Sequence, residues 1–218
     1  MTEQHLTVAR TARYYQLGEL SAATHHLWVV CHGYGQLASY FSRHFAFLPE
    51  ENPDTVVVAP EGLSRFYLNG TSGRVGASWM TRDDRLSEIN DHIGFLNQLL
   101  GALLPRCAAD VQVSVLGFSQ GTATVSRWLA LSPRTWPLHQ LVLWAGNFPE
   151  DIPIPAAQVL LQNLPVSLVC GRQDEYISPE KLQAQAETLR QFGATLQVVE
   201  FDGGHSLNAA VLRQLTTR

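Results

Sequence analysis

The chain has 218 residues, of which 45% are hydrophobic and 16% charged, and its formal net charge is -4. This length and balance are typical of a globular protein with a sizeable core. The small negative charge and the lack of a basic block argue against a nucleic-acid-binding surface, so we expect no nucleic-acid partner. No apolar run is long enough to span a bilayer, so we expect no stable membrane insertion.

The predicted strands and helices alternate along the chain. Residues 7–17 are rich in Thr, Val and Tyr, which favours one or two edge strands. Later apolar runs have the composition of buried parallel strands and lie at residues 26–31, 55–59, 111–117, 138–145, 166–170 and 196–201. Helical patterns lie between them at residues 37–48 (ending at Pro49), 83–104, 122–131 and 178–192, and a final helix follows His205.

This alternation predicts an α/β fold, with a mostly parallel central sheet and helices on both faces, in a single domain over residues 1–218. Two segments fit neither pattern. Residues 149–155 form a proline-rich connection, and residues 63–80 combine glycines and aromatics without a clear period. Irregular loops as long as residues 63–80 are usually functional or mobile, so we interpret this one as a lid or pocket loop.

One short stretch holds the candidate nucleophile. Residues 111–121 read Val-Gln-Val-Ser-Val-Leu-Gly-Phe-Ser-Gln-Gly, a buried strand that we expect to break at Gly117 before the next helix. Gly-x-Ser-x-Gly between a strand and a helix is the nucleophile-elbow pattern, in which a sharp turn exposes the serine hydroxyl, here that of Ser119. The turn holds the serine in a strained conformation, and side chains at Gly117 or Gly121 would clash there.

Two further loops supply partners for this serine, since ligand-binding loops of such a sheet meet at the carboxyl ends of its strands. The order Ser119, Asp174, His205 is the triad order of α/β-hydrolases. We predict that the serine attacks a carbonyl carbon, that the histidine transfers the proton, and that the aspartate orients the histidine. Glu175 is the alternative acid. The alternative roles are a plain turn for Ser119, a turn carboxylate for Asp174 and a histidine at a helix start for His205.

Two backbone N–H groups are predicted to stabilise the developing oxyanion. One belongs to Gln120, directly after the candidate nucleophile, and the other to Tyr34, in the glycine-rich turn after the strand at residues 26–31. Trp79, Met80 and Phe148 are candidate substrate-binding residues because they lie in or near irregular segments after strands. Packing in the core is the alternative for all three side chains.

In combination these motifs resemble the phospholipase/carboxylesterase family of α/β-hydrolases, which includes acyl-protein thioesterases and small bacterial carboxylesterases. The matching pieces are His32-Gly-Tyr-Gly-Gln36, Ser78-Trp79, Gly117-Phe-Ser-Gln-Gly121, Gly171-x-x-Asp174 and Gly204-His205. The resemblance runs from the first core strand to the last helix. It implies the α/β-hydrolase fold and hydrolysis of an ester or thioester, with neither a metal nor an organic cofactor.

The chain departs from the usual family pattern at three places that flank the acyl and leaving-group pockets. Thr122 stands where a second glycine is common, Tyr34-Gly35-Gln36 replaces Leu-Gly-Asp, and Met80-Thr81 replaces Phe-Asp. These changes leave the substrate open. We predict a serine esterase acting on small carboxylic esters. An acyl-protein thioesterase or lysophospholipase is the first alternative, and a non-catalytic binding module on the same fold is the second.

The expected cellular location rests on two weaker observations. Residues 2–5 are polar and lack a signal-peptide pattern. The three cysteines, Cys31, Cys107 and Cys170, show no disulfide-framework spacing, which fits a reducing compartment. We therefore expect a cytoplasmic protein, with a homodimer as an open question.

Overall fold

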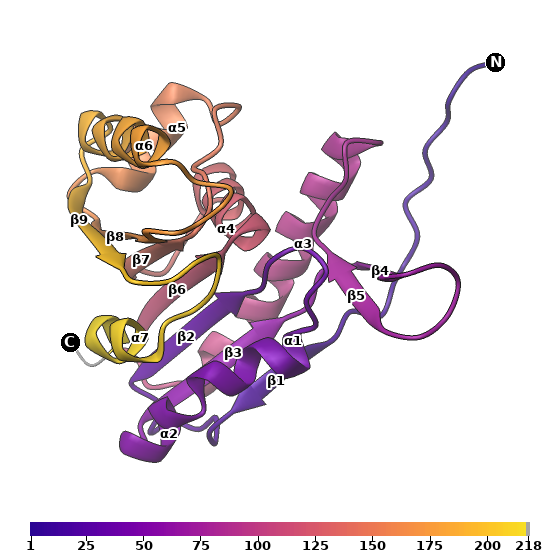
Figure 1. Cartoon of the computed structure of the whole chain (residues 1–218). Coiled ribbons are helices and arrows are strands. Elements are labelled where there is room, and N and C mark those ends of the chain that lie inside the picture. The colour runs from indigo at the N-terminus through magenta and orange to yellow at the C-terminus, as the bar shows by residue number, and fades with distance from the viewer. Residues whose placement is uncertain (217–218) are drawn as a thin grey trace.

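The structure is a computed structural model that describes residues 1–216. Within this range, a seven-stranded sheet has the order β1-β3-β2-β6-β7-β8-β9 (Figure 1). All of its neighbouring strands are parallel except β1, which pairs antiparallel with β3 at one edge. The strands are β1 (Tyr14–Leu17), β2 (His26–Cys31), β3 (Thr55–Pro60), β6 (Gln112–Phe118), β7 (Leu138–Trp144), β8 (Pro165–Gly171) and β9 (Thr195–Phe201). The predicted mostly parallel sheet is confirmed.

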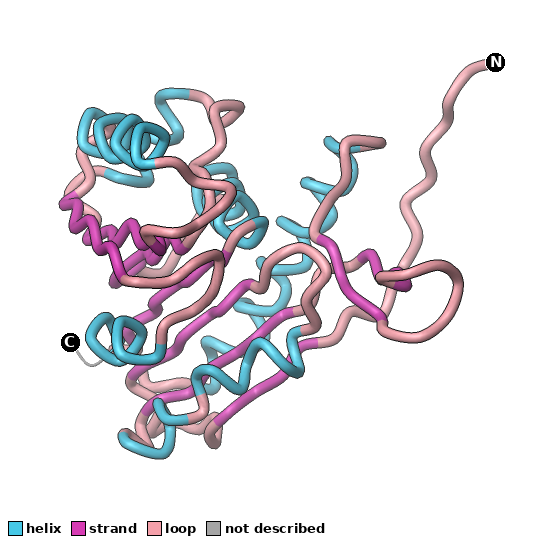
Figure 2. The backbone as a smooth tube through the Cα atoms, in the orientation of Figure 1, coloured by secondary structure: helices cyan, strands magenta, loops and turns pink. Residues whose placement is uncertain are grey.

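Helices cover both faces of this sheet (Figures 1 and 2). One face carries α3 (Arg85–Leu103), α4 (Gln120–Leu131), α5 (Ile154–Leu161) and α6 (Pro179–Gln191), whose buried side chains share one hydrophobic cluster. The other carries α1 (Ala38–Phe41), α2 (Phe47–Glu51) and α7 (Ala209–Thr216), which share a second cluster. Short 3-10 turns at Ser42–Phe45 and Leu104–Arg106 complete the helical segments. No helix within residues 1–216 is long and apolar enough to cross a membrane.

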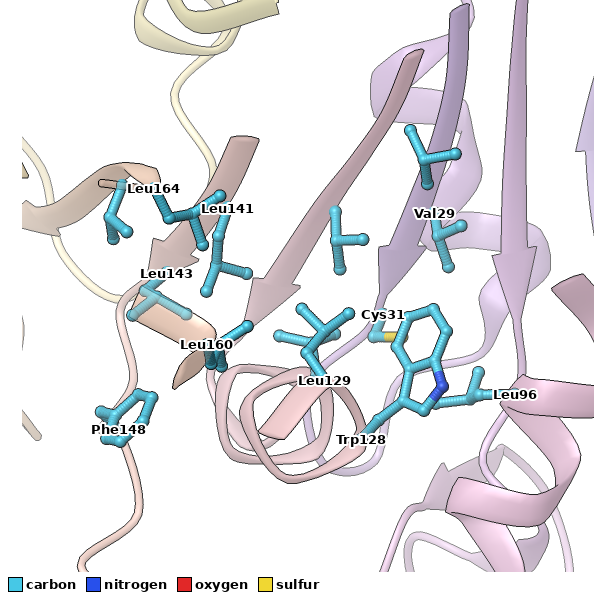
Figure 3. Close-up of a cluster of buried hydrophobic side chains, with 14 of the residues drawn as sticks. Val29, Cys31, Leu96, Trp128, Leu129, Leu141, Leu143, Phe148, Leu160 and Leu164 are labelled. Carbon is cyan, nitrogen blue, oxygen red and sulfur yellow. The ribbon is translucent and has the colours of Figure 1, made fainter. Parts of the chain in front are cut away.

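Successive side chains of β2 enter opposite clusters. Val29 and Cys31 belong to the cluster beneath α3 and α4, where Figure 3 shows Cys31 beside Trp128, whereas Trp28 and Val30 belong to the cluster beneath α1 and α7. All four are at most 3% exposed. A strand covered on both faces needs apolar residues at every position, which is why this run lacks polar alternation.

The helix predicted at residues 37–48 is instead three short pieces, and its predicted end at Pro49 is wrong. The chain passes from α1 through the 3-10 turn Ser42–Phe45 into α2, which contains Pro49. Proline is tolerated there because the first turn of a helix leaves its N–H groups without intrahelical acceptors. The segment packs Phe41, Phe45 and Leu48 into the core in place of one regular amphipathic face.

Three further expectations need correction. Residues 63–80 are not irregular throughout, because β4 (Ser64–Tyr67) and β5 (Val75–Ser78) pair there as an antiparallel hairpin outside the main sheet. The proline-rich connection leads directly into α5, with Pro153 as N-cap and Pro155 in the first turn, where the ring's fixed φ suits a helix start. The strand before the serine continues through Phe118, and the helix begins at Gln120, so the break lies at Ser119 alone.

Candidate active site

The turn between β6 and α4 holds Ser119 in a conformation that few residues adopt. Its φ is 54° and its ψ is -118°, a strained region that persists only where the surroundings hold it. The Ser119 N–H donates to the carbonyl of Trp144 (2.8 Å), which ties the turn to the end of β7. A Cβ at Gly117 would lie 2.4 Å from the Gly121 carbonyl oxygen, whereas one at Gly121 would lie 2.2 Å from that of Cys31. The second glycine is therefore required by the neighbouring strand β2.

The structure brings the three predicted catalytic residues into one hydrogen-bonded chain. The Oγ of Ser119 lies 2.9 Å from Nε2 of His205, and Nδ1 of His205 lies 2.8 Å from Oδ2 of Asp174. The Asp174 side chain is fully buried and that of His205 is 16% exposed. The other oxygen, Oδ1, accepts the N–H groups of Tyr176 (2.9 Å) and Ile177 (3.2 Å), which fixes the carboxylate plane.

Glu175 does not take part in this chain. It is exposed, whereas Asp174 contacts the imidazole directly. Each member follows the carboxyl end of a different strand, namely β6, β8 and β9. These strands belong to the half of the sheet that runs from β6 through β7 and β8 to β9. An imidazole held between a hydroxyl and a buried carboxylate can accept the hydroxyl proton, because the carboxylate stabilises the imidazolium that forms.

Two backbone donors are free, one directly after Ser119 and one in the glycine-rich turn after β2. Within residues 1–216, the N–H groups of Tyr34 and Gln120 donate to no protein acceptor. The glycine-rich turn that contains Tyr34 is held by His32, whose Nε2 accepts from the N–H of Gly62 (3.0 Å) and whose Nδ1 lies 2.7 Å from the Gly33 carbonyl oxygen. Burial lowers the pKa of His32, so it stays neutral with its proton on Nδ1. Free donors in a fixed turn suit a transient oxyanion.

The side chain of Gln120 links this turn to the segment after β5. Its Oε1 accepts from the N–H of Trp79 (3.1 Å), and its Nε2 donates to the carbonyl of Met80 (2.7 Å). The Ser78 hydroxyl completes the group, since it donates to the same Met80 carbonyl (2.8 Å). The residue that follows Ser119 is thus held through its side chain as well as through α4.

The three predicted substrate-binding residues lie in different surroundings. Trp79 is 1% exposed, and its Nε1 donates to the His32 carbonyl (2.9 Å), so it packs beneath the glycine-rich turn. Phe148 is 8% exposed and packs against Phe192. Met80 is half-buried, and its sulfur lies 3.6 Å from a guanidinium nitrogen of Arg127. Of the three, Met80 keeps the most surface for a ligand.

A separate cavity of about 540 Å³ opens beside the glycine-rich turn, between α1 and the β4–β5 hairpin. None of the three predicted substrate-binding residues lines it. Its lining combines apolar with polar side chains and comprises Gly35, Gln36, Leu37, Tyr40, Phe41, His44, Leu68, Arg74 and Val75. Phe41 connects its wall to the site, because the Phe41 ring contacts Phe118 and the Phe118 ring contacts His205.

A family model described as Phospholipase/Carboxylesterase matches residues 18–217. The chain belongs to the phospholipase/carboxylesterase family. Membership of this family supports a hydrolase that acts on ester substrates. No curated protein sequence matches the chain significantly.

Several solved structures share this fold at low sequence identity. Esterase PE8 is 21% identical with a TM-score of 0.73, and the alignment covers 95% of this chain and 97% of that one. Acyl-protein thioesterase 2 of Zea mays is 19% identical with a TM-score of 0.70 and the same coverage. A carboxylesterase from Mesorhizobium loti is 18% identical with a TM-score of 0.67, and the alignment covers 94% of each chain. At these identities the similarity establishes the α/β-hydrolase fold alone.

Two residues that support this site were not predicted to do so from the sequence. Trp144 donates from Nε1 to the Ser206 carbonyl (3.0 Å) and so fixes the loop of His205. Glu61 is 2% exposed and accepts the N–H of Ala38 (3.2 Å) at the start of α1. A charged residue directly after a buried strand is a usable signal for Glu61. The contacts of Trp144 have no local signature, because Ser206 lies 62 positions away.

Proposed function

We propose that this chain is a serine hydrolase that cleaves small carboxylic esters through an acyl-enzyme. The observation that carries the proposal is the unbroken series of hydrogen bonds from the Ser119 hydroxyl through His205 to the buried Asp174. Family membership supports the same class of reaction.

The proposed reaction has two halves. His205 removes the proton of the Ser119 hydroxyl as Oγ bonds to the ester carbonyl carbon, and the tetrahedral oxyanion accepts hydrogen bonds from the N–H groups of Tyr34 and Gln120. The bond between the carbonyl carbon and the alcohol oxygen then breaks as His205 donates the proton to that oxygen. Water then attacks the acyl-enzyme with His205 as base, and the carboxylic acid and free Ser119 are released.

The test compares Ser119→Ala with a control serine at the other end of the same helix. Ser132 follows the last residue of α4, and its Oγ accepts only from Asn97 Nδ2 (3.1 Å) among the described residues. We expect Ser119→Ala to lose p-nitrophenyl acetate hydrolysis and labelling by a fluorophosphonate, while Ser132→Ala keeps both. Folded wild-type protein that neither hydrolyses esters nor takes up the label would leave a binding module as the remaining explanation.

A second candidate activity, on long-chain acyl thioesters or lysophospholipids, is favoured by one observation. The cavity of about 540 Å³ beside the glycine-rich turn has four apolar wall residues, Leu37, Phe41, Leu68 and Val75, and is in the size range of small-molecule pockets. Hydrolysis of p-nitrophenyl esters from acetyl to palmitoyl separates the two candidates. A maximum at short chains supports the small-ester assignment, whereas a maximum at long chains supports the second candidate.

A further inference from the structure

One exposed aromatic side chain lies directly against the proposed general base. The ring of Tyr176 is 4.7 Å from that of His205, centroid to centroid, and the two planes meet at 70°. Tyr176 is 63% exposed. The other ring on His205 belongs to Phe118, which is 3% exposed and therefore has no surface for a ligand.

The backbone of Tyr176 is fixed although its ring is open to solvent. Its N–H donates to Oδ1 of Asp174 (2.9 Å), so its Cα keeps a constant position relative to the acid and the histidine. Within residues 1–216 the phenolic hydroxyl has no hydrogen-bond partner. The ring is therefore available as a contact surface, and its hydroxyl is not needed for its placement.

The direction of proton transfer determines which part of the ester lies against the ring of Tyr176. In the proposed reaction, Nε2 of His205 hands its proton to the departing alcohol, so that alcohol must lie next to His205. The oxyanion points away from it, toward the N–H groups of Tyr34 and Gln120. A ring packed on the exposed side of His205 therefore borders the alcohol half of the ester and not the carbonyl oxygen.

We propose that Tyr176 is a specificity-determining residue that favours esters of aromatic alcohols, with the leaving group packing against its ring. This proposal rests on the proposed function. An offset or edge-to-face aromatic pair is more stable than an aliphatic contact of equal area. The difference corresponds to a factor of about 2 to 10 in kcat/KM. The substrate class is thus an ester with an arylmethyl or similar aromatic alcohol.

The experiment compares benzyl acetate with cyclohexylmethyl acetate, which differ in the aromaticity of one ring. The readout is the ratio of their kcat/KM values in wild type, Tyr176→Phe, Tyr176→Leu and Tyr67→Leu, the last being an exposed tyrosine on β4. A ratio divides out any general loss of activity. We expect a preference for benzyl acetate of about 2- to 10-fold in wild type, retained in Tyr176→Phe and Tyr67→Leu and lost in Tyr176→Leu.

Three results would overturn the proposal. They are no preference for benzyl acetate in wild type, an unchanged kcat/KM ratio in Tyr176→Leu, or a ratio that falls as far in Tyr176→Phe as in Tyr176→Leu. A second measurement does not need turnover. Calorimetric titration gives the dissociation constants of both esters for Ser119→Ala and for the double variant Ser119→Ala/Tyr176→Leu. We expect Ser119→Ala to bind benzyl acetate more tightly by the same factor and the double variant to lose this preference. Absence of hydrolysis with a retained binding preference would refute the proposed function alone, whereas hydrolysis without a preference would refute this inference alone.

Discussion

Replacing Gln120 by methionine removes the hydrogen bonds of its side chain but keeps its length. The Trp79 N–H, on a residue that is 1% exposed, would lose its acceptor, which costs about 1–3 kcal/mol. The bond from Nε2 to the Met80 carbonyl contributes about 0.5–1.5 kcal/mol more. We therefore expect the free energy of unfolding to fall by about 1.5–4.5 kcal/mol.

The same change should slow catalysis. The backbone N–H of Gln120 is one of the two proposed oxyanion donors, and its position depends on the turn that the side chain holds. Full loss of one such donor lowers kcat about 10²–10³-fold, so a displaced donor should lower kcat within that limit while KM changes little.

Urea unfolding and p-nitrophenyl acetate kinetics measure the two effects. Gln120→Glu is the matched control, because it keeps an acceptor for Trp79 but loses the donor to Met80, and it should fall between wild type and Gln120→Met. Should Gln120→Met remain within about 0.5 kcal/mol of wild type and within about threefold in kcat, the side chain does not hold the turn and the reasoning is wrong.

Three further predictions concern the buried acid, a core histidine and the elbow. Asp174→Asn should lower kcat by about 10⁴ because it favours the wrong imidazole tautomer, whereas exposed Glu175→Gln should keep near wild-type kcat; the reverse pattern would assign the acid to Glu175. Both ring nitrogens of His92 are buried with no hydrogen-bond partner among residues 1–216, and burial lowers its pKa to about 4. Because the unfolded chain takes up this proton near pH 6.5, stability should fall by up to about 3 kcal/mol from pH 6.5 to 4, and urea titrations of His92→Leu should lack that component. Gly121→Ala places a Cβ 2.2 Å from the Cys31 carbonyl oxygen, so its melting temperature should drop sharply; an unchanged value would contradict the close packing of β2 against α4.

The sequence was most informative where one local rule decides the structure. The run Leu27–Cys31 is apolar throughout because both faces of β2 are covered, and the bounds of β2, His26–Cys31, match the prediction. The elbow at Ser119 has a short sequence pattern, although only Gly117 is required by its own turn, whereas Gly121 is required by the Cys31 carbonyl of β2. At such positions few other residue types are tolerated, so the sequence pattern alone locates the strand and the elbow.

The errors fall where tertiary contacts override a local pattern. Residues 37–48 look like one helix, but packing of Phe41 and Phe45 beneath the sheet divides the segment. Residues 63–80 have no helical or strand period, yet they form a hairpin whose two strands pair only with each other. The prolines near residue 153 suggested a connection because proline disfavours helix interiors. That rule does not apply to the first turn of a helix, where these prolines lie.

Residue patterns alone were enough to predict the α/β class, the position of the elbow and the chain order of a serine, an acid and a histidine. The fold alone sets the distances between them, because Ser119 and His205 are 86 positions apart and meet through the register of parallel strands. It also decided that Trp79 is covered while Tyr176 is open. Exposure depends on which distant segments pack over a side chain, and no local pattern encodes that.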